Sequence, residues 1–110
     1  MVDGFWIVQY EGLKGKGSGV AVFVKGKIFG GDSGSTFIGT YLVDAATVKA
    51  RVKIHNYMPG VASVIGMEGD YDLDVSGTVE GEVIKGTGSP AGHQVAGMAL
   101  RMTRIGKLPE

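Results

Sequence analysis

The segment TVKARVKIHN, residues 47–56, alternates apolar with mostly basic side chains, and EGDYDLDV, residues 68–75, alternates acidic with apolar ones. A period of two is the pattern of a β-strand with one face in a core and the other in water. Opposite charges on the two segments favour antiparallel pairing, and a constant register gives three ion pairs. These are Lys53 with Asp70, Arg51 with Asp72 and Lys49 with Asp74. We interpret the charged face mainly as a solvated wall.

Short alternating segments of this kind extend along the chain, without a helical stripe longer than about two turns. We predict strands at residues 5–11, 19–25, 27–30, 36–43, 47–56, 67–76, 78–85 and 94–104. Consecutive antiparallel strands are expected to close, with the last beside the first, because closure removes exposed edges. The sequence therefore predicts an all-β fold, an eight-stranded antiparallel meander barrel, with residues 1–110 as a single β-barrel domain.

Glycine is the compositional outlier, with 20 of the 110 residues against a typical share of about 7%. We expect these glycines at turns and strand bends. Lys25-Gly26-Lys27 suits a tight hairpin, and residues 12–19 and 86–92 suit longer loops. The connection at residues 58–66 has room for a short helical turn.

Charge and cysteine content exclude several classes of function. Lys plus Arg and Asp plus Glu number 11 each, so net charge does not favour nucleic acid or a membrane surface as partner. The chain has no cysteine, which excludes disulfides and thiolate metal sites. Neither a secretory signal nor a spanning segment is evident, and a cytoplasmic location is expected.

Three motifs resemble catalytic or metal-binding elements but have a simpler interpretation. GDSG at residues 31–34 is similar to the nucleophile segment of chymotrypsin-like proteases, which need two barrels and a longer chain, so we interpret it as a tight turn. GKGSG at residues 15–19 leads into a strand rather than a helix, unlike a phosphate-binding loop. His55 and His93 lack the spacing of zinc ligands. We expect no enzyme activity, no cofactor and no metal.

The inner face of the barrel is the candidate ligand site. An eight-stranded barrel is just wide enough to be filled by side chains or to hold one small ligand, and both possibilities stay open. The residues expected to point inward are Trp6, Val8, Tyr10, Val20, Val22, Phe37, Tyr41, Val52, Ile54, Leu73, Met98, Leu100 and Met102. Aromatic and methionine side chains line adaptable pockets. The candidate cavity residues are accordingly Trp6, Tyr10, Tyr41, Leu73, Met98 and Met102.

A second apolar face is expected on the outside of the first, second and last strands, which are neighbours in a closed barrel. A contiguous outer apolar patch usually marks an interaction surface, so we predict a homodimer packed through this wall. The candidate dimer residues are Phe5, Ile7, Ala21, Phe23, Val95 and Ala99.

The segment GGDSG at residues 30–34, followed by Phe37, Gly39 and Tyr41 and preceded by Asp3-Gly4, resembles the GrlR-like family. The resemblance continues through residues 55–57, 63–64 and 71–73. It implies a small lipocalin-like barrel, commonly dimeric, whose name-giving members are negative regulators of type III secretion genes. Those regulators sequester a transcriptional activator and do not touch DNA.

The family's acidic partner-binding segment corresponds here to residues 44–47, in which Asp44 is the one carboxylate. Asp44 therefore marks the candidate partner loop. We expect a non-enzymatic regulatory protein that binds a transcriptional regulator, and the alternative is a binding protein for a small hydrophobic ligand in the barrel.

Overall fold

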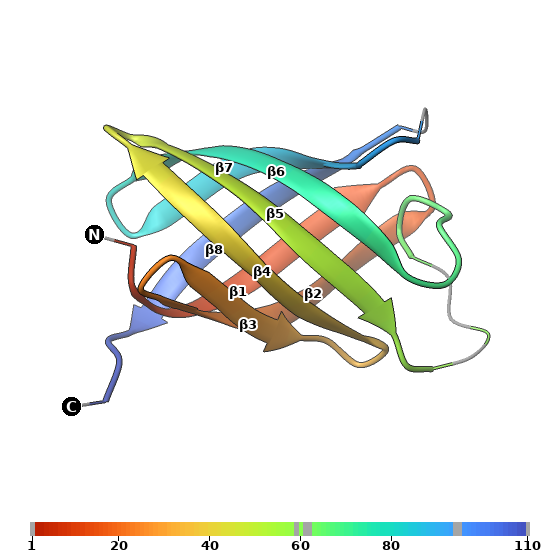
Figure 1. Cartoon of the computed structure of the whole chain (residues 1–110), viewed down its shortest axis with the longest axis horizontal. Coiled ribbons are helices and arrows are strands. Elements are labelled where there is room, and N and C mark those ends of the chain that lie inside the picture. Colours follow the sequence, from red (N-terminus) through yellow and green to blue (C-terminus); the bar gives the residue numbers. More distant parts are fainter. Residues whose placement is uncertain (1, 59, 61–62, 94–95, 110) are drawn as a thin grey trace.

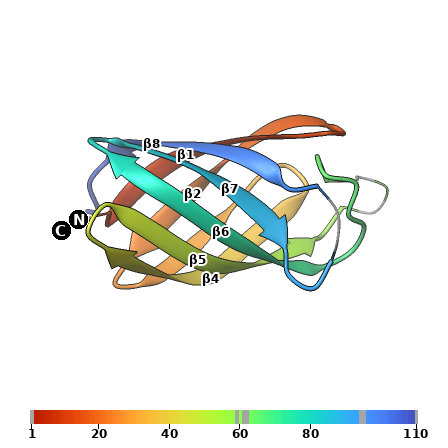
Figure 2. The ribbon, with the colours of Figure 1, turned by 90° about the horizontal axis from the view of Figure 1, so that it is seen from above.

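Antiparallel strands form the regular structure of this chain in a computed structural model, which describes residues 2–58, 60, 63–93 and 96–109. Eight strands lie within these residues: β1 (Gly4–Gly12), β2 (Gly15–Val24), β3 (Lys27–Gly31), β4 (Ser35–Asp44), β5 (Thr47–Asn56), β6 (Tyr71–Glu80), β7 (Val83–Pro90) and β8 (Met98–Gly106). Each strand pairs with the next, and β8 pairs with β1 to close the barrel (Figures 1 and 2). The predicted closed meander is confirmed. None of the described residues belongs to a helix long and apolar enough to cross a bilayer.

The hairpin between β2 and β3 has the two-residue turn expected from the sequence. Lys25 and Gly26 both have positive φ, 49° and 80°. Two central residues with positive φ match the right-handed twist of the flanking strands, and glycine adopts this conformation without strain. The prediction of a tight hairpin is confirmed.

The hairpin of β6 and β7 turns later than expected. The sequence suggested a break near Gly77 and a loop at residues 86–92, whereas β6 continues to Glu80, the turn lies at Gly81-Glu82, and β7 runs to Pro90. Gly86 lies within β7, where a Cβ would overlap the carbonyl oxygen of Ser76 on β6. Glycine here serves close strand contact rather than a turn, so the expected boundaries were wrong.

The register of β5 and β6 differs by two residues from the expected one. Arg51 lies opposite Asp74 and Lys53 opposite Asp72, while Lys49 lies opposite Ser76. A shift of two keeps every side chain on its predicted face, so alternation alone could not detect it. The observed register places Tyr71 rather than Gly69 opposite Ile54, which gives this core residue an aromatic neighbour.

The second strand faces the opposite way from the prediction. Ala21 and Phe23 are buried, whereas Val20 is exposed and Val22 is half-buried. Ala21 lies opposite Trp6 in the β1–β2 ladder, and directly opposed residues share a face of the sheet. The inward assignment of Val20 and Val22 was therefore wrong. The other inward residues do face the interior, with Tyr10 and Phe37 only partly buried.

One end of the barrel is filled. Trp6, Val48 and Ile84 are the largest fully buried side chains. The indole Nε1 of Trp6 donates a hydrogen bond to the Val2 carbonyl oxygen at 2.9 Å. This bond holds Val2 at the filled end of the barrel. The Arg104 guanidinium lies over the Trp6 ring, 5.4 Å from its centroid. Its contact with the ring is a cation–π interaction.

Candidate ligand cavity and outer apolar row

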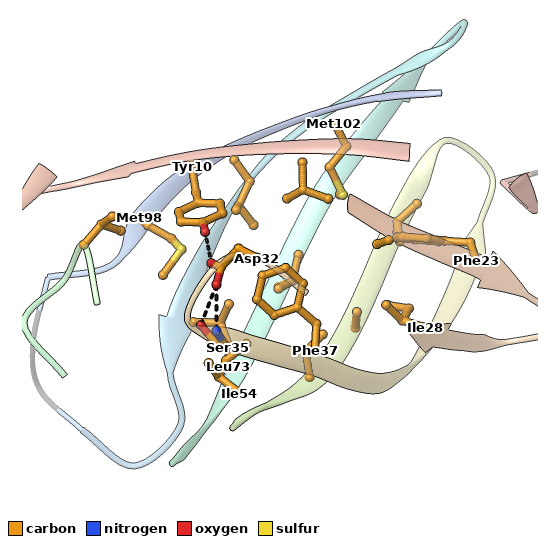
Figure 3. A pocket seen from close by; sticks show the side chains of 18 of the residues that line it. Tyr10, Phe23, Ile28, Asp32, Ser35, Phe37, Ile54, Leu73, Met98 and Met102 are labelled. Carbon is orange, nitrogen blue, oxygen red and sulfur yellow. Dashed lines mark hydrogen bonds between the residues drawn. The ribbon is translucent and has the colours of Figure 1, made fainter. Parts of the chain in front are cut away.

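The other half of the barrel contains a half-open cavity of about 100 Å³. Its wall is almost entirely apolar, and Figure 3 shows Tyr10, Asp32 and Ser35 at the end away from Phe23 and Ile28. The lining residues are Val8, Tyr10, Ala21, Phe23, Ile28, Asp32, Ser35, Phe37, Val48, Ala50, Val52, Ile54, Val64, Tyr71, Leu73, Val75, Met98, Leu100 and Met102. The barrel is thus partly filled and partly hollow.

Four of the predicted cavity residues line this space, namely Tyr10, Leu73, Met98 and Met102. Trp6 and Tyr41 are buried but do not line it. Both pack against Phe23, with ring centroids 5.7 Å and 5.1 Å away. Phe23 therefore separates both residues from the cavity. Because the sequence pattern placed Phe23 on the outer face of the second strand, this separation could not be predicted.

Asp32, in the turn between β3 and β4, is the acidic group of the cavity wall. Its Oδ1 accepts hydrogen bonds from the backbone N–H groups of Gly34 and Ser35 at 2.9 and 2.8 Å, and from the Ser35 hydroxyl at 3.0 Å. These bonds are those of an Asx turn and agree with the interpretation of GDSG as a tight turn. Its Oδ2 accepts a hydrogen bond from the Tyr10 hydroxyl.

The Tyr10–Asp32 pair has one charged and one neutral member. Burial acts to raise the pKa of Asp32, but the hydrogen bonds from Tyr10, Gly34 and Ser35 outweigh burial and hold that pKa below its ordinary value. Burial, followed by the hydrogen bond to Asp32, raises the pKa of Tyr10. At neutral pH the pair therefore consists of a carboxylate and a phenol.

The sequence around Asp32 contains only a weak signal that this residue lines the cavity. Asp before Ser-Gly predicts a turn, and nothing in that pattern says which way the carboxylate points. The signal that could have found it is the neighbouring strand β4, where Phe37 was already assigned to the interior. The tight turn places Asp32 and Ser35 at the same end of the barrel as Phe37 (Figure 3).

The connection between β5 and β6 contributes to the cavity wall through Val64. The Val64 carbonyl oxygen accepts a hydrogen bond from the Lys14 N–H at 2.7 Å, and Ile65 is buried. At the start of this connection, the Tyr57 hydroxyl donates to the backbone carbonyl oxygen of Asp32 at 2.9 Å. The sequence left room for a short helical turn in this connection, and its described part contains turns and no helix.

Four apolar residues lie in one line across the outside of β1 to β4. Phe5 is opposite Val22, Val22 is opposite Phe29, and Phe29 is opposite Ile38. Phe29 and Ile38 are 44% and 50% exposed. We call these four residues the outer apolar row. The adjoining line, Ile7, Val20, Gly31 and Thr36, also carries no charge.

The predicted dimer surface is therefore partly wrong. Phe5, Ile7 and Ala99 do face outward, but Ala21 and Phe23 point into the barrel. Ala99 lies opposite Glu11, toward the other end of β1 from Phe5. Val95 lies outside the described residues. The outward apolar residues of the second strand are Val20 and Val22.

The candidate partner loop lies at the hairpin between β4 and β5. Asp44 ends β4 and is exposed, opposite Thr47. Leu42, two residues before it, is 79% exposed. The loop thus combines one carboxylate with an exposed leucine.

The outer face of β5 makes charged and polar contacts with the segment that contains β6. Arg51 forms a salt bridge with Asp74 at 2.7 Å, and the His55 Nδ1 lies 2.9 Å from Asp70. These contacts agree with the interpretation of a solvated charged face. Within the described part of the chain, no group of three or more His, Asp or Glu side chains is arranged to hold a metal ion.

Comparison with known proteins adds no assignment: no protein-family model matches this chain, and no curated protein matches it either.

Proposed function

We propose that this chain is a non-enzymatic regulatory binding protein that acts as a homodimer and sequesters a transcriptional regulator. The resemblance of residues 30–34 and of Asp3-Gly4 to the GrlR-like family supports the regulatory role. The outer apolar row supports the dimer, and the exposed Leu42 beside Asp44 supports a separate contact with the partner protein.

The observation that carries the proposal is the outer apolar row. Its four side chains, of which Phe29 and Ile38 are exposed and Phe5 and Val22 are half-buried, form a contiguous line on a single wall. Such patches on water-soluble surfaces mark interaction sites, because burying them releases about 25 cal/mol per Å². A second copy is the occupant that fits best. The outer apolar row and the line on one side of it, Ile7, Val20, Gly31 and Thr36, carry no charge, whereas the line on the other side contains Lys27. Two copies that meet through the two uncharged lines leave Lys27 at the edge of the contact and bury no unpaired charge.

The partner protein is assigned to the β4–β5 hairpin. Leu42 points away from the barrel and is not part of the outer apolar row, so a partner can reach it in the dimer. The single carboxylate of Asp44 leaves apolar contact as the main source of affinity at this loop.

The test is site-specific photo-crosslinking in the native host. With the photoreactive residue at position 42, we expect a DNA-binding transcriptional regulator to be cross-linked. At Lys85, an exposed position on β7, we expect the yield to fall to background. Deletion of the gene should change the transcripts that this regulator controls, and Leu42→Asp should not restore them. Equal yields at both positions, with unchanged transcripts, would contradict the proposal.

The second candidate function is binding of a small hydrophobic ligand in the barrel, and the half-open apolar cavity favours it. Native mass spectrometry of the purified chain with small apolar molecules tests it. Trp6 fluorescence is a less direct probe, because Phe23 stands between Trp6 and the cavity. A retained ligand mass supports this candidate, and absence of any retained mass from a graded set of small hydrophobes opposes it.

A further inference from the structure

The charge on the described wall of the cavity is negative only. Asp32 is its anionic residue, and none of the described lining residues is basic. Among the residues described, no lysine, arginine or histidine nitrogen lies within 4.0 Å of the Asp32 carboxylate. Hydrogen-bond donors, rather than a counter-ion, hold this charge in place. A bound molecule would therefore meet an unneutralised negative charge.

The hydrogen bonds to Asp32 are unevenly divided between its two oxygens. Oδ1 accepts from Gly34 N–H, Ser35 N–H and the Ser35 hydroxyl, whereas Oδ2 accepts from the Tyr10 hydroxyl. Each carboxylate oxygen has about two lone-pair directions. Oδ2 thus has room for one more donor, and it is the oxygen on the Tyr10 side of the cavity (Figure 3).

The same end of the cavity has aromatic walls. The Tyr10 and Phe37 rings meet edge to face with centroids 6.4 Å apart, and both line the cavity. Aromatic faces attract cations as well as apolar groups. An anion would have to lie next to Asp32 or be buried among apolar side chains, and both positions are unfavourable. A protonated amine meets an acceptor and aromatic walls together.

We propose that the cavity binds a small amine in its ammonium form, with an apolar body the size of about one six-membered ring and its nitrogen donating to Oδ2 of Asp32. This inference rests on the second candidate function, ligand binding inside the barrel, and names the class of ligand. An apolar cavity of about 150 Å³ is known to hold benzene. The present cavity is smaller, about 100 Å³, but half-open, so one ring that is not fully enclosed is the upper limit for the apolar body. A long-chain fatty acid has the wrong size and the wrong charge.

Calorimetric titration at neutral pH with benzylamine, benzyl alcohol and benzoate tests the proposal, since the three probes share a ring and differ in charge. We expect benzylamine to bind about tenfold more tightly than benzyl alcohol, because charge-assisted hydrogen bonds are about twice as strong as neutral ones. Benzoate should bind most weakly. Equal affinity for all three, or a preference for benzoate, would overturn the proposal while leaving ligand binding in the barrel intact.

Asp32→Asn is the matched variant. Its amide oxygen can still accept from Gly34 and Ser35 in the turn, but the negative charge is gone. We expect the preference for benzylamine to fall to about twofold or less, while Asp72→Asn, which removes an exposed carboxylate on the outer face of β6, leaves it unchanged. An undiminished preference in Asp32→Asn overturns the assignment to Asp32. If none of the probes binds the wild-type chain, this inference and the second candidate function both fail.

Discussion

The hydroxyl of Tyr10 on β1 donates a hydrogen bond to Oδ2 of Asp32 in the β3–β4 turn, a contact between residues 22 positions apart in the chain. The bond links the wall of the barrel to the turn at one end of the cavity, and Tyr57 adds a second link through the Asp32 carbonyl oxygen. The turn, the connection after β5 and the cavity wall are thus held by one small group of polar contacts.

Removal of the Tyr10 hydroxyl tests the strength of this link. Tyr10→Phe keeps the ring in the cavity wall but deprives Asp32 of a donor, and we expect a loss of about 1 kcal/mol in the free energy of unfolding. Urea denaturation measures it. Tyr57→Phe is the control, since its exposed hydroxyl donates to a neutral carbonyl oxygen and should contribute less. A larger loss of unfolding free energy in Tyr57→Phe than in Tyr10→Phe would contradict the larger contribution assigned to the Tyr10–Asp32 hydrogen bond.

The lowered pKa of Asp32 predicts a dependence of stability on pH. Burial opposes the shift, and the hydrogen bonds from Tyr10, Gly34 and Ser35 produce it, relative to an ordinary value of 3.8. A carboxyl group whose pKa is lower in the folded state stabilises the fold above its ordinary pKa. This contribution is lost as the pH falls through the folded-state pKa.

Thermal unfolding of the wild-type chain and of Asp32→Asn between about pH 6 and about pH 2 checks this sign. We expect the wild-type chain to be the more stable at the upper limit and the two melting temperatures to converge at the lower one. Exposed carboxylates titrate in both proteins and cancel in the comparison. A constant difference across the range would mean that the pKa of Asp32 is not lowered by folding.

Gly86 is predicted to be intolerant of a side chain. A Cβ at this position overlaps the carbonyl oxygen of Ser76, and that of Gly106 has no atom within 4 Å. Overpacking of a closed interior destabilises by about 1–3 kcal/mol, so Gly86→Ala should lower the melting temperature clearly. Gly106→Ala should remain within about 0.5 kcal/mol of the wild-type chain. Equal stability of the two variants would place the β6–β7 hairpin in a different register.

The filled end of the barrel is expected to supply more stability per residue than the outer surface. Ile84 is 0% exposed and Ile105 is 53% exposed. Ile84→Ala should lower the free energy of unfolding by about 2–5 kcal/mol, whereas Ile105→Ala should change it by about 0.5 kcal/mol or less. Chemical denaturation of both variants measures this difference. Similar losses of unfolding free energy in the two variants would show that Ile84 is not tightly packed at this end of the barrel.

The sequence was sufficient to predict the closed meander because most strands alternate clearly and the first and last strands are both apolar enough to pair. It was insufficient for β2, where Val20, Ala21, Val22 and Phe23 are all apolar. With apolar residues at every position, alternation cannot identify the inner face. The pairing of Ala21 with Trp6 decides it, and that pairing is a tertiary property.

Register and turn position failed for related reasons. Charge complementarity is satisfied both by Arg51 opposite Asp72 and by Arg51 opposite Asp74, so charge alone does not decide between the two registers. The observed register places Tyr71 opposite Ile54. Gly77 was predicted near a turn and instead lies in β6, where the Ile84 Cγ2 would be 2.9 Å from an added Cβ. A missing side chain can serve a turn or a close contact, and local sequence does not separate the two.

Some residues of the candidate site could be predicted from the sequence and others could not. Tyr10, Leu73, Met98 and Met102 followed from alternation, whereas Asp32 required knowledge of the direction in which a turn presents its carboxylate. An apolar patch on the outside of the barrel was predicted, but most of its residues were not. The residues depend on which face of β2 points outward and on Phe29 and Ile38 lying beside each other.

Light scattering coupled to size-exclusion chromatography, at micromolar concentration, tests the proposed dimer most directly. We expect twice the monomer mass for the wild-type chain and for Leu42→Asp, and the monomer mass for the double variant Phe29→Asp with Ile38→Asp. Circular dichroism confirms that each variant keeps its strands. A monomeric wild-type chain, or a dimer that persists in the double variant, would contradict the assignment of the outer apolar row.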